Sequence, residues 1–370
     1  MFEIVQESKI GASIKVIGVG GGGNNSVDAI YKKKGLFGVE YININTDIQA
    51  LKASIVPHKI QIGLKTTGGV GTGSNIDLGR RSLNENRSEV AEALKNLDIV
   101  FVTCGLGGGT GTGAAPLICE IAKELGALTI AVVTSPFLFE GEKRGAQAKD
   151  GLREIKEKSN AVISIPNQKL FGTIEKESSF LKAFEFANNT LFDAISAISD
   201  LVTAPGIINL DISDIRQVLS HGNEATLAVG TAYGEKSTSS VVKNALLCPL
   251  MEGVDIKGAK TMLVNITGDE NLSIGEVEKI IDNVRKAVTH SANIVFGAII
   301  DKKLNNGLKL TIVATDIPSL GKKEEFASDV SRVHKRESAI KDRVMLEKVN
   351  RELGGDSNLD IPTFLRAKTR

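Results

Sequence analysis

The stretch CGLGGGTGTGAAP, residues 104–116, holds six glycines and two threonines and almost nothing bulky. Glycine costs roughly 0.5–1 kcal/mol relative to alanine wherever regular structure must hold it, so packing alone gives no reason for such a stretch. We therefore expect the backbone here to approach another molecule closely. An apolar run at 98–105 precedes the stretch and a helical pattern at 113–127 follows it. Such loops lie at the carboxyl end of a strand, where open α/β sheets bind their ligands.

The surrounding sequence predicts a doubly wound α/β fold. Short runs rich in Ile and Val occur at 13–20, 39–47, 98–105, 128–136 and 160–167. Helical patterns lie between them, among them 113–127 and 140–159. Buried strands that alternate with helices form a Rossmann-like parallel sheet with helices on both faces.

A longer helix and a second α+β unit follow. Apolar residues recur every three or four positions from 179 to 202, at Phe180, Phe184, Ala187, Leu191, Ile195, Ile198 and Val202. This spacing predicts one helix with a continuous apolar stripe, ended by Pro205 and Gly206. Strands are expected at 225–234, 259–268, 292–300 and 307–315, with helices at 236–247 and 273–289.

The composition is that of an ordinary globular chain of 370 residues, with a net charge of +1. It offers no global electrostatic case for binding nucleic acid or an anionic membrane. Apolar runs are too short for a transmembrane helix. Three cysteines, Cys104, Cys119 and Cys248, occur without CxxC spacing. Such a set favours reduced thiols over disulfides or a zinc site, and predicts a cytosolic protein.

Two further glycine loops accompany the first. In GVGGGGNN (18–25), Gly18, Gly20 and Gly23 have the GxGxxG spacing directly after a strand, and Asp47 ends the next strand. This pattern leaves an NAD-dependent oxidoreductase open as an alternative, with Asp47 on the ribose. The third loop is GGVGTGSN (68–75). Three such loops suit a triphosphate better than a pyrophosphate.

Phosphate binding would rest on backbone groups. Gly107, Gly108 and Gly109 allow successive N–H groups to point into one concavity, and Thr110 and Thr112 add hydroxyls. The following helix adds its positive end. The chain has no GxxxxGK[ST] motif and no lysine in the three loops, so we expect Mg²⁺ to offset the remaining phosphate charge.

Sugar and base contacts need other groups. Glu140 and Arg144 stand four residues apart and could contact ribose and phosphate, or form an ordinary surface pair. Asn167 follows the next strand. Phe184 and Asn188 lie one helical turn apart and could stack on and read a purine, although Phe184 alone reads more simply as a core aromatic.

Taken together, these motifs resemble the tubulin/FtsZ family of GTPases, and in particular its bacterial cell-division members. The resemblance covers roughly residues 13–316 and the last twelve. GGGTGTG (107–113) matches the superfamily signature without a substitution. The motifs at 18–25, 45–51, 136–144, 165–170 and 183–191 follow in the family's order.

The resemblance implies GTP or GDP as the nucleotide, and a set of residues that bind it. These are Gly21, Gly22, Gly23, Asn25, Thr72, Gly73, Gly107, Gly108, Gly109, Thr110, Gly111, Thr112, Gly113, Glu140, Arg144, Asn167, Phe184 and Asn188. It also implies a tubulin-like organisation. A GTP-binding domain would span 1–177, a central helix 178–204, an activation domain 205–318, a charged linker 319–358 and an adaptor-binding peptide 359–370.

The stretch GIINLDISDIR (206–216) resembles the family's activating loop, which implies catalytic roles for Asn209, Asp211 and Asp214. In that family the loop of one subunit completes the GTP site of the next, so hydrolysis would accompany head-to-tail assembly into the division ring. Without the resemblance, the two acids read as helix-capping carboxylates.

The tail resembles the family's terminal peptide, which binds membrane-tethering adaptors. The matching residues are Asp360, Ile361, Pro362, Phe364, Leu365 and Arg366. The implied partners are other copies of the chain and these adaptors, with no nucleic acid, no direct membrane insertion and no metal held by protein side chains. The implied location is the cytoplasm at mid-cell.

The chain departs from the family pattern at a few positions. Gly68 and Thr72 replace an arginine and an alanine, Asn223 and Ala228 replace glycines, and Ser237 replaces a basic residue. Alanine is unfavourable where glycine supplied a positive φ. A divergent copolymer with weak GTPase activity is therefore a second hypothesis, ahead of the oxidoreductase.

Overall fold

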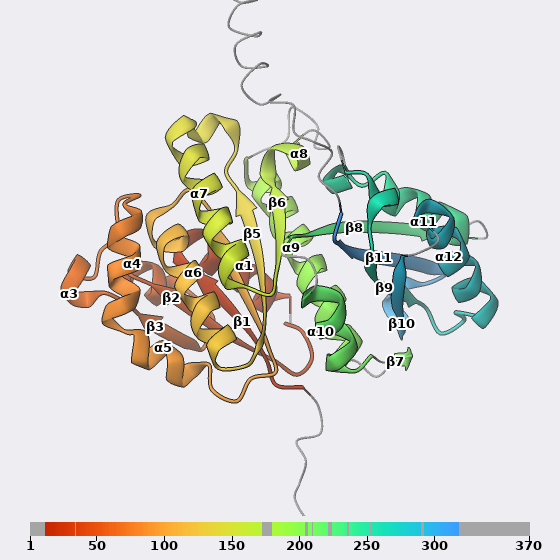
Figure 1. Cartoon of the computed structure of the whole chain (residues 1–370), viewed down its shortest axis with the longest axis horizontal. Coiled ribbons are helices and arrows are strands. Elements are labelled where there is room, and N and C mark those ends of the chain that lie inside the picture. Colours follow the sequence, from red (N-terminus) through yellow and green to blue (C-terminus); the bar gives the residue numbers. More distant parts are fainter. Residues whose placement is uncertain are drawn as a thin grey trace, which may run out of the picture. The chain divides into compact units, whose positions relative to one another are not determined.

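One eleven-stranded sheet in the order β3-β2-β1-β4-β5-β6-β8-β11-β9-β10-β7 organises the described chain of this computed structural model (Figure 1). Residues 12–33, 35–171, 180–203, 206–208, 210–220, 224–234, 237–251, 254–289 and 292–317 are described. The strands are β1 (Ile14–Val19), β2 (Val39–Asn45), β3 (His58–Gln61), β4 (Ile99–Gly105), β5 (Leu128–Ser135), β6 (Ala161–Pro166), β7 (Gly206–Ile208), β8 (Glu224–Tyr233), β9 (Thr261–Gly268), β10 (Asn293–Ile300) and β11 (Gly307–Thr315).

The helices fill the intervals that the sequence pattern predicts and several more. They are α1 (Gly20–Lys32), α2 (Ile48–Ala53), α3 (Leu64–Thr67), α4 (Ile76–Glu85), α5 (Arg87–Ala93), α6 (Gly109–Glu124), α7 (Glu142–Lys158), α8 (Asn167–Phe171), α9 (Phe180–Thr203), α10 (Ile212–Ser220), α11 (Ser237–Leu246) and α12 (Ile274–Ala287). The short elements β3, β7, α2, α3, α5 and α8 were not predicted, because segments of three to seven residues carry too little periodicity.

The first half is a doubly wound parallel sheet, as the sequence predicts. Strands β3-β2-β1-β4-β5-β6 are all parallel to their neighbours. Side chains alternate between the two faces: Val16 belongs to the apolar cluster that includes residues of α1, α9 and α10, whereas Ile17 belongs to the cluster that includes residues of α4 to α7. The strands are therefore buried on both faces, which explains their near-continuous Ile and Val composition.

The second half continues the same sheet. β6 and β8 pair in parallel through Val162–Glu224 and Ile163–Ala225. β8, β11 and β9 are antiparallel, and α11 and α12 cover one of their faces over a separate core. Contacts group the described residues into one compact unit. The finer domain boundaries within 1–318 remain a prediction.

Helix α9 packs against strands from both halves of the sheet, including β5 and β6 and also β9, β10 and β11. Its buried residues include Ala187, Leu191, Ile195 and Ile198, as the stripe predicts. Phe184 is an exception: 46% of it is exposed, so the interpretation as a core aromatic is wrong. The preceding residue, Ala183, is buried, whereas the ring of Phe184 lies against Phe137.

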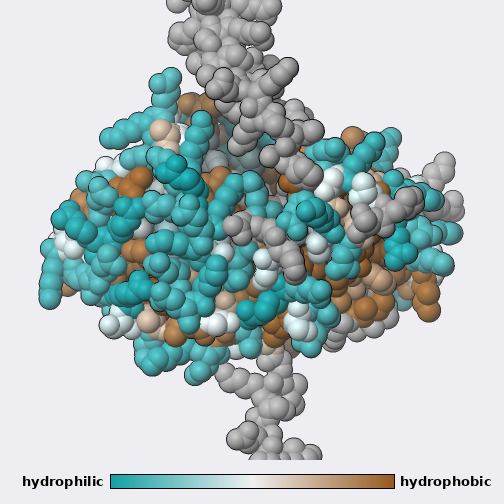
Figure 2. Space-filling model, in the orientation of Figure 1, coloured by the Kyte–Doolittle hydropathy of each residue, from teal (hydrophilic) through white to brown (hydrophobic). Residues whose placement is uncertain are grey.

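The surface in Figure 2 is mainly hydrophilic over α4, α5 and α7, and hydrophobic residues gather beside α12 and β10. Ile274, at the start of α12, is 87% exposed. Ile294, Val295 and Phe296 of β10 are only half-buried. In the described part of the chain, no helix combines the length and apolar character needed to cross a membrane.

Asp200 is a half-buried carboxyl group on the helix that packs against both halves of the sheet. It lies on α9, and burial raises its pKa to about 6. The charge of Lys309 opposes this shift and that of Asp301 adds to it. Lys309 donates to Asp193 over 2.6 Å. Burial also raises the pKa of Tyr41 to about 12, although its hydroxyl accepts from Leu36 N, and the Asp200 charge contributes.

Asp200→Asn is expected to stabilise the fold at pH 7.5 by about 1–2 kcal/mol, because it removes a buried charge. A raised carboxyl pKa means that the folded state holds the proton more tightly. The free energy of unfolding then falls as pH rises from about 4 to about 6. The variant should lose that part of the pH dependence in denaturant titrations at pH 4.5 and 7.5. Asp193→Asn, which breaks the pair with Lys309, serves as a control of opposite sign; equal behaviour of both variants would contradict the assignment.

Candidate functional site

The two main glycine loops lie side by side where the strand order reverses. β1 pairs with β2 on one side and β4 on the other, and its last residue, Val19, is level with Ile44 and Cys104. The chain leaves β1 and β4 at the same edge and enters α1 and α6. Crevices at such switch points are where open α/β sheets bind ligands.

The start of α1 presents backbone to open space. Gly20 has φ +70°, and a Cβ there would lie 2.8 Å from the backbone N of Gly111 in α6. Gly21, Gly22 and Asn25 are exposed, and a Cβ on Gly21 would meet no atom within 4 Å. Two helix N-termini, neither with an acidic residue in its first turn, thus converge on one open region. Such ends favour an anion.

The start of α6 is more tightly held. Gly107 has φ +90°, its N–H donates to Thr112 Oγ1 over 2.9 Å, and a Cβ there would lie 2.8 Å from the carbonyl oxygen of Arg144. Gly108 is half-buried, and a Cβ on it would have only Gly105 O within 4 Å, at 3.8 Å. Among these glycines, Gly108 faces the open space.

The expectation that packing does not require the glycines of 104–116 is wrong for four of the six, namely Gly107, described above, and Gly109, Gly111 and Gly113. A Cβ on Gly109 would lie 2.2 Å from Thr72 Oγ1, and one on Gly113 would lie 2.2 Å from Ile76 O. A Cβ on Gly111 would lie 3.0 Å from Gly105 O, and one on Gly23 2.4 Å from Thr103 O. Helix α6 begins at Gly109, so these residues let α4, β4 and α1 approach its first turns backbone to backbone. Their role in binding GTP stays a prediction.

The third loop connects α3 to α4 and bends through left-handed residues. Gly68, Gly69, Gly73 and Ser74 all have φ between +57° and +83°. Gly68 ends α3 in this conformation, so glycine rather than arginine relieves strain there. Gly73 is exposed with no neighbour to a Cβ, whereas Thr72 is 6% exposed.

The predicted ribose group is partly assembled. Arg144 Nη1 pairs with Glu140 Oε2 at 2.7 Å, and Glu140 Oε1 accepts from Phe137 N at 2.9 Å. Asn167 is 6% exposed, and its Oδ1 lacks a hydrogen-bond partner among the described residues. A buried unpaired acceptor costs free energy, so it fits a donor from a bound molecule, such as a ribose hydroxyl.

The predicted base group lies on α9. Phe184 contacts Phe137 edge-on, with ring centroids 5.6 Å apart, and Phe137 stacks on Phe139. Ser26 Oγ of α1 donates to Asn188 Oδ1 over 2.8 Å. The amide N–H₂ of Asn188 is then the part left to meet a ligand. α1 and α9 are thereby joined beside the exposed glycines.

The predicted catalytic acids lie at the opposite edge of the sheet. Asp211 immediately precedes α10, Asp214 is in its first turn, and both are exposed. Arg216 of α10 donates to the carbonyl of Gly126, which precedes β5 at the amino end of the strands. β5 has eight residues, so the two edges are about 25 Å apart. Figure 1 shows α8, which follows β6, in the upper part of the view and α10 in the lower part. Asn209 lies outside the described residues.

Two of the departures are accommodated. Ala228 is buried in β8, pairs with Ile312 and does not have a positive φ, so alanine causes no backbone strain there. Ser237 begins α11 and its N–H donates to Gly234 O. Asn223 and the tail from 318 onward lie outside the described residues.

Asp47 does not have the geometry that the oxidoreductase alternative requires of it. Its Oδ1 accepts from Gln49 N at 2.8 Å and Ala50 N at 3.3 Å, which makes it the N-cap of α2. The carboxylate is therefore committed to a helix end. Burial raises the pKa of the Cys104 thiol to about 12, so it supplies no thiolate nucleophile to the site.

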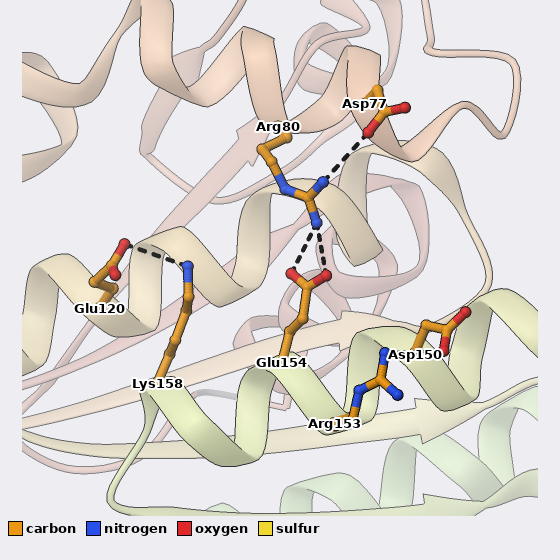
Figure 3. Close-up of polar contacts among 7 residues, drawn as sticks. All are labelled: Asp77, Arg80, Glu120, Asp150, Arg153, Glu154 and Lys158. Carbon is orange, nitrogen blue, oxygen red and sulfur yellow. Dashed lines mark hydrogen bonds and ion pairs between the residues drawn. The ribbon is translucent and has the colours of Figure 1, made fainter.

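A surface ion-pair network braces the helices that carry the third loop and the ribose group. Arg80 of α4 donates through Nη2 to both carboxylate oxygens of Glu154 on α7, at 2.7 and 2.8 Å (Figure 3). Lys158 pairs with Glu120 of α6. Nearer the site, Gln147 Nε2 of α7 donates to Ser74 O. Loop 68–75 is thus tied to α7 as well as to α6.

Several residues important here were not predicted. Asn24 is buried and spans β1 and β2 by donating to Gly18 O and Ile44 O, which leaves exposed Asn25 beside it to face the ligand space. Thr46 and Ser26 also contact residues of other elements, and no periodicity in the sequence indicates such contacts. Among the described residues, no group of three His, Cys, Asp or Glu side chains could hold a metal ion.

Family models match both halves of the chain. Residues 13–175 match the GTPase domain of the Tubulin/FtsZ family, and residues 223–318 match the C-terminal domain of the FtsZ family. A cell division protein FtsZ from Coxiella burnetii is 42% identical over 319 residues, which cover 86% of this chain and 82% of that protein.

Solved structures agree. The FtsZ dimer of M. jannaschii superposes with a TM-score of 0.79 at 38% identity, over 85% of this chain and 90% of that one. CetZ2 from Haloferax volcanii, in a GTPγS-bound protofilament, has a TM-score of 0.71 over 89% of this chain and 99% of that one. At 21% identity, the latter shows the fold alone.

The two classes of glycine should respond differently to alanine. Gly109→Ala is expected to lower stability by about 1–3 kcal/mol, because the new methyl group has no room beside Thr72 and Asn75. Gly21→Ala, also in a first helical turn but facing open space, should leave stability equal or raised. Thermal unfolding without nucleotide measures both. Equal destabilisation of the two variants would contradict the packing assignment.

Proposed function

The chain belongs to the tubulin/FtsZ family, and we propose on this premise that the groups at its two sheet edges form one GTP-hydrolysing site between successive subunits. The chain is a tubulin-like GTPase of cell division that binds GTP and GDP and self-associates. What remains to be assigned is which residues do this and how.

The observation that carries the proposal is the separation of the acids from the glycine loops. The loops follow the carboxyl ends of β1 and β4, whereas Arg216 joins α10 to the amino edge at Gly126. Asp211 and Asp214 therefore cannot reach a nucleotide on their own subunit. A head-to-tail neighbour would place them there, and such a heterologous contact propagates into a filament.

We assign the phosphates to the space in front of the exposed and half-buried glycines Gly21, Gly22, Gly73 and Gly108, with Asn25. The packed residues Gly23, Thr72, Gly107, Gly109, Thr110, Gly111, Thr112 and Gly113 shape this space and turn backbone dipoles toward it. Arg144 and Asn167 would hold the ribose, Glu140 would orient Arg144, and Phe184 and Asn188 would contact the guanine. The unpaired Oδ1 of Asn167 and the remaining N–H₂ of Asn188 support this arrangement.

Asp211 and Asp214 are suited to orient a water molecule against the γ-phosphate of the neighbouring subunit. Both are exposed and, among the described residues, their side chains make no hydrogen bond or ion pair. Positioning and electrostatics supply most of the acceleration in phosphoryl transfer, so a strong base is not required. Asn209 would join them. Mg²⁺ would neutralise phosphate charge, held by phosphate and water oxygens, since no described acidic cluster offers a protein site.

Apolar surface beside the acids supports an intersubunit contact there. β7 leads into the acidic loop and pairs with β10, and Ile208 of β7 is 37% exposed. The half-buried Ile294, Val295 and Phe296 lie on the same β10 strand. Exposed apolar residues at a polar rim are typical of protein interfaces.

We further propose that residues 360–366 recruit membrane-tethering adaptors and that the protein works in the cytoplasm at mid-cell. The resemblance of Asp360, Ile361, Pro362, Phe364, Leu365 and Arg366 to the family's terminal peptide supports this. The hypothesis of a weakly hydrolysing copolymer differs in rate only, and phosphate release from the pure chain separates the two.

Asp211→Asn and Asp214→Asn should each lower phosphate release about 100-fold or more, with GTP affinity nearly unchanged. The reason is that the acids belong to the neighbour's site. Phosphate release, nucleotide binding and GTP-dependent sedimentation measure the effect, and exposed Glu157→Gln on α7 is the matched control. Loss of GTP binding in parallel with turnover would place the acids in the subunit's own pocket.

Complementation tests the shared site directly. Gly21→Leu should fill the phosphate space while leaving the acidic loop intact, and Asp214→Asn does the reverse. An equimolar mixture of these two inactive variants should recover about a quarter of wild-type turnover, because one in four contacts pairs an intact pocket with an intact loop. A mixture that stays as inactive as its components, although it co-sediments, would refute the shared site.

A further inference from the structure

Three buried threonine hydroxyls form a chain behind the proposed phosphate space. Thr110 Oγ1 lies 3.0 Å from Thr46 Oγ1 and 3.3 Å from Thr72 Oγ1. The three residues are 7%, 0% and 6% exposed, respectively. Hydroxyls buried this deeply lose their hydration and must bond to one another or leave a donor unmet.

Each hydroxyl comes from a different segment of the site. Thr46 follows β2, Thr110 is the second residue of α6, and Thr72 is in loop 68–75. Thr72 lies directly against Gly109, and its Oγ1 occupies the space that a Cβ on residue 109 would need. The chain of hydroxyls therefore connects the end of a strand, a helix N-terminus and a loop.

Loop 68–75 depends on few contacts of this kind. Four of its residues have a positive φ, among them the non-glycine Ser74, and such conformations persist only when the surroundings hold them. Apart from bonds to α3 and α4, the helices that it connects, two hydrogen bonds to its carbonyl groups hold it among the described residues: Ile48 N donates to Gly69 O and Gln147 Nε2 to Ser74 O. The hydroxyl of Thr72 is thus its side-chain link to α6.

Because each threonine hydroxyl has a single proton to donate, the chain of threonines responds to a bound anion. Each hydroxyl donates once and accepts up to twice. If Thr110 donates to an anion at the α6 N-terminus, its lone pairs are left to accept from Thr46 and Thr72. Successive bonds in such a chain polarise and strengthen one another. A bound phosphate would therefore tighten the bond from Thr72, and with it the hold on the loop.

We propose that Thr72 is a positioning residue that couples the order of loop 68–75 to occupancy of the phosphate space through Thr110. The proposal rests on the proposed function, which supplies a phosphate at the N-terminus of α6. What it adds is the assignment of the coupling to the side chain of Thr72. Linkage requires the coupling to be reciprocal, so loss of the bond should weaken phosphate binding as well as loosen the loop.

Thr72→Val, which is nearly isosteric and lacks the hydroxyl, is the decisive variant. It should lower GTP affinity about five- to tenfold, the size of one lost hydrogen bond. It should also abolish most of the GTP-induced slowing of amide hydrogen exchange at residues 70–75. Thr72→Ser keeps the hydroxyl and should stay within about twofold of wild type in affinity. Half-buried Thr66→Val is the matched control, since its hydroxyl bonds Glu85 outside the chain of threonines.

Thr46→Val separates coupling from simple packing. It removes the other donor to Thr110 but leaves the bond between Thr72 and Thr110, so GTP affinity should fall while the loop without nucleotide keeps wild-type exchange. Thermal unfolding confirms that each variant is folded. Identical affinity and exchange for Thr72→Val and Thr72→Ser would overturn the coupling. Failure of the wild-type chain to bind GTP would instead overturn the proposed function, and the coupling with it.

Discussion

The close approach of two helix N-termini is the constraint on which the rest of the site depends. α1 and α6 leave adjacent parallel strands, and Gly20 meets the backbone of Gly111 where no side chain fits. Only glycine allows this contact, and the contact aligns two sets of backbone N–H groups and two positive helix ends on one space. The close packing contacts are made at Gly109 and Gly111 instead, which leaves the N–H groups of Gly21 and Gly108 open to that space.

Rigidity around that space is provided from three sides. Ser26 and Asn188 join α1 to α9, which itself packs on strands of both halves of the sheet. Arg80 and Glu154 hold α4 to α7 on the outer face. The buried threonines join β2, α6 and loop 68–75 from below. A site that recognises charge through fixed dipoles requires such support, because reorganisation of the dipoles would cost the same free energy that binding gains.

Under the proposed function, the geometry gives a reason why assembly and hydrolysis would belong together. One edge of the sheet holds the glycine loops with their backbone donors, and the opposite edge presents the two exposed carboxylates of α10 with a partly apolar strand beside them. On the proposed assignment, neither edge is a complete hydrolytic site. A parallel sheet maintains this polarity along its whole length, since every βαβ unit returns the chain to the same edge.

The sequence by itself determined the longer strands and helices, the parallel sheet and the glycine loops, because period, turn residues and βα alternation are local properties. Through the resemblance of a short motif it also singled out the acids of α10, whose catalytic role stays a prediction. Only the tertiary structure decided which glycines face a ligand and which face Thr72, Ile76 or Thr103, since both kinds have the same sequence signature. It likewise placed Asp47 at a helix cap, exposed Phe184, relieved Ala228 of strain and brought Thr46, Thr72 and Thr110 together. These outcomes depend on contacts between residues far apart in the chain, and no local pattern encodes them.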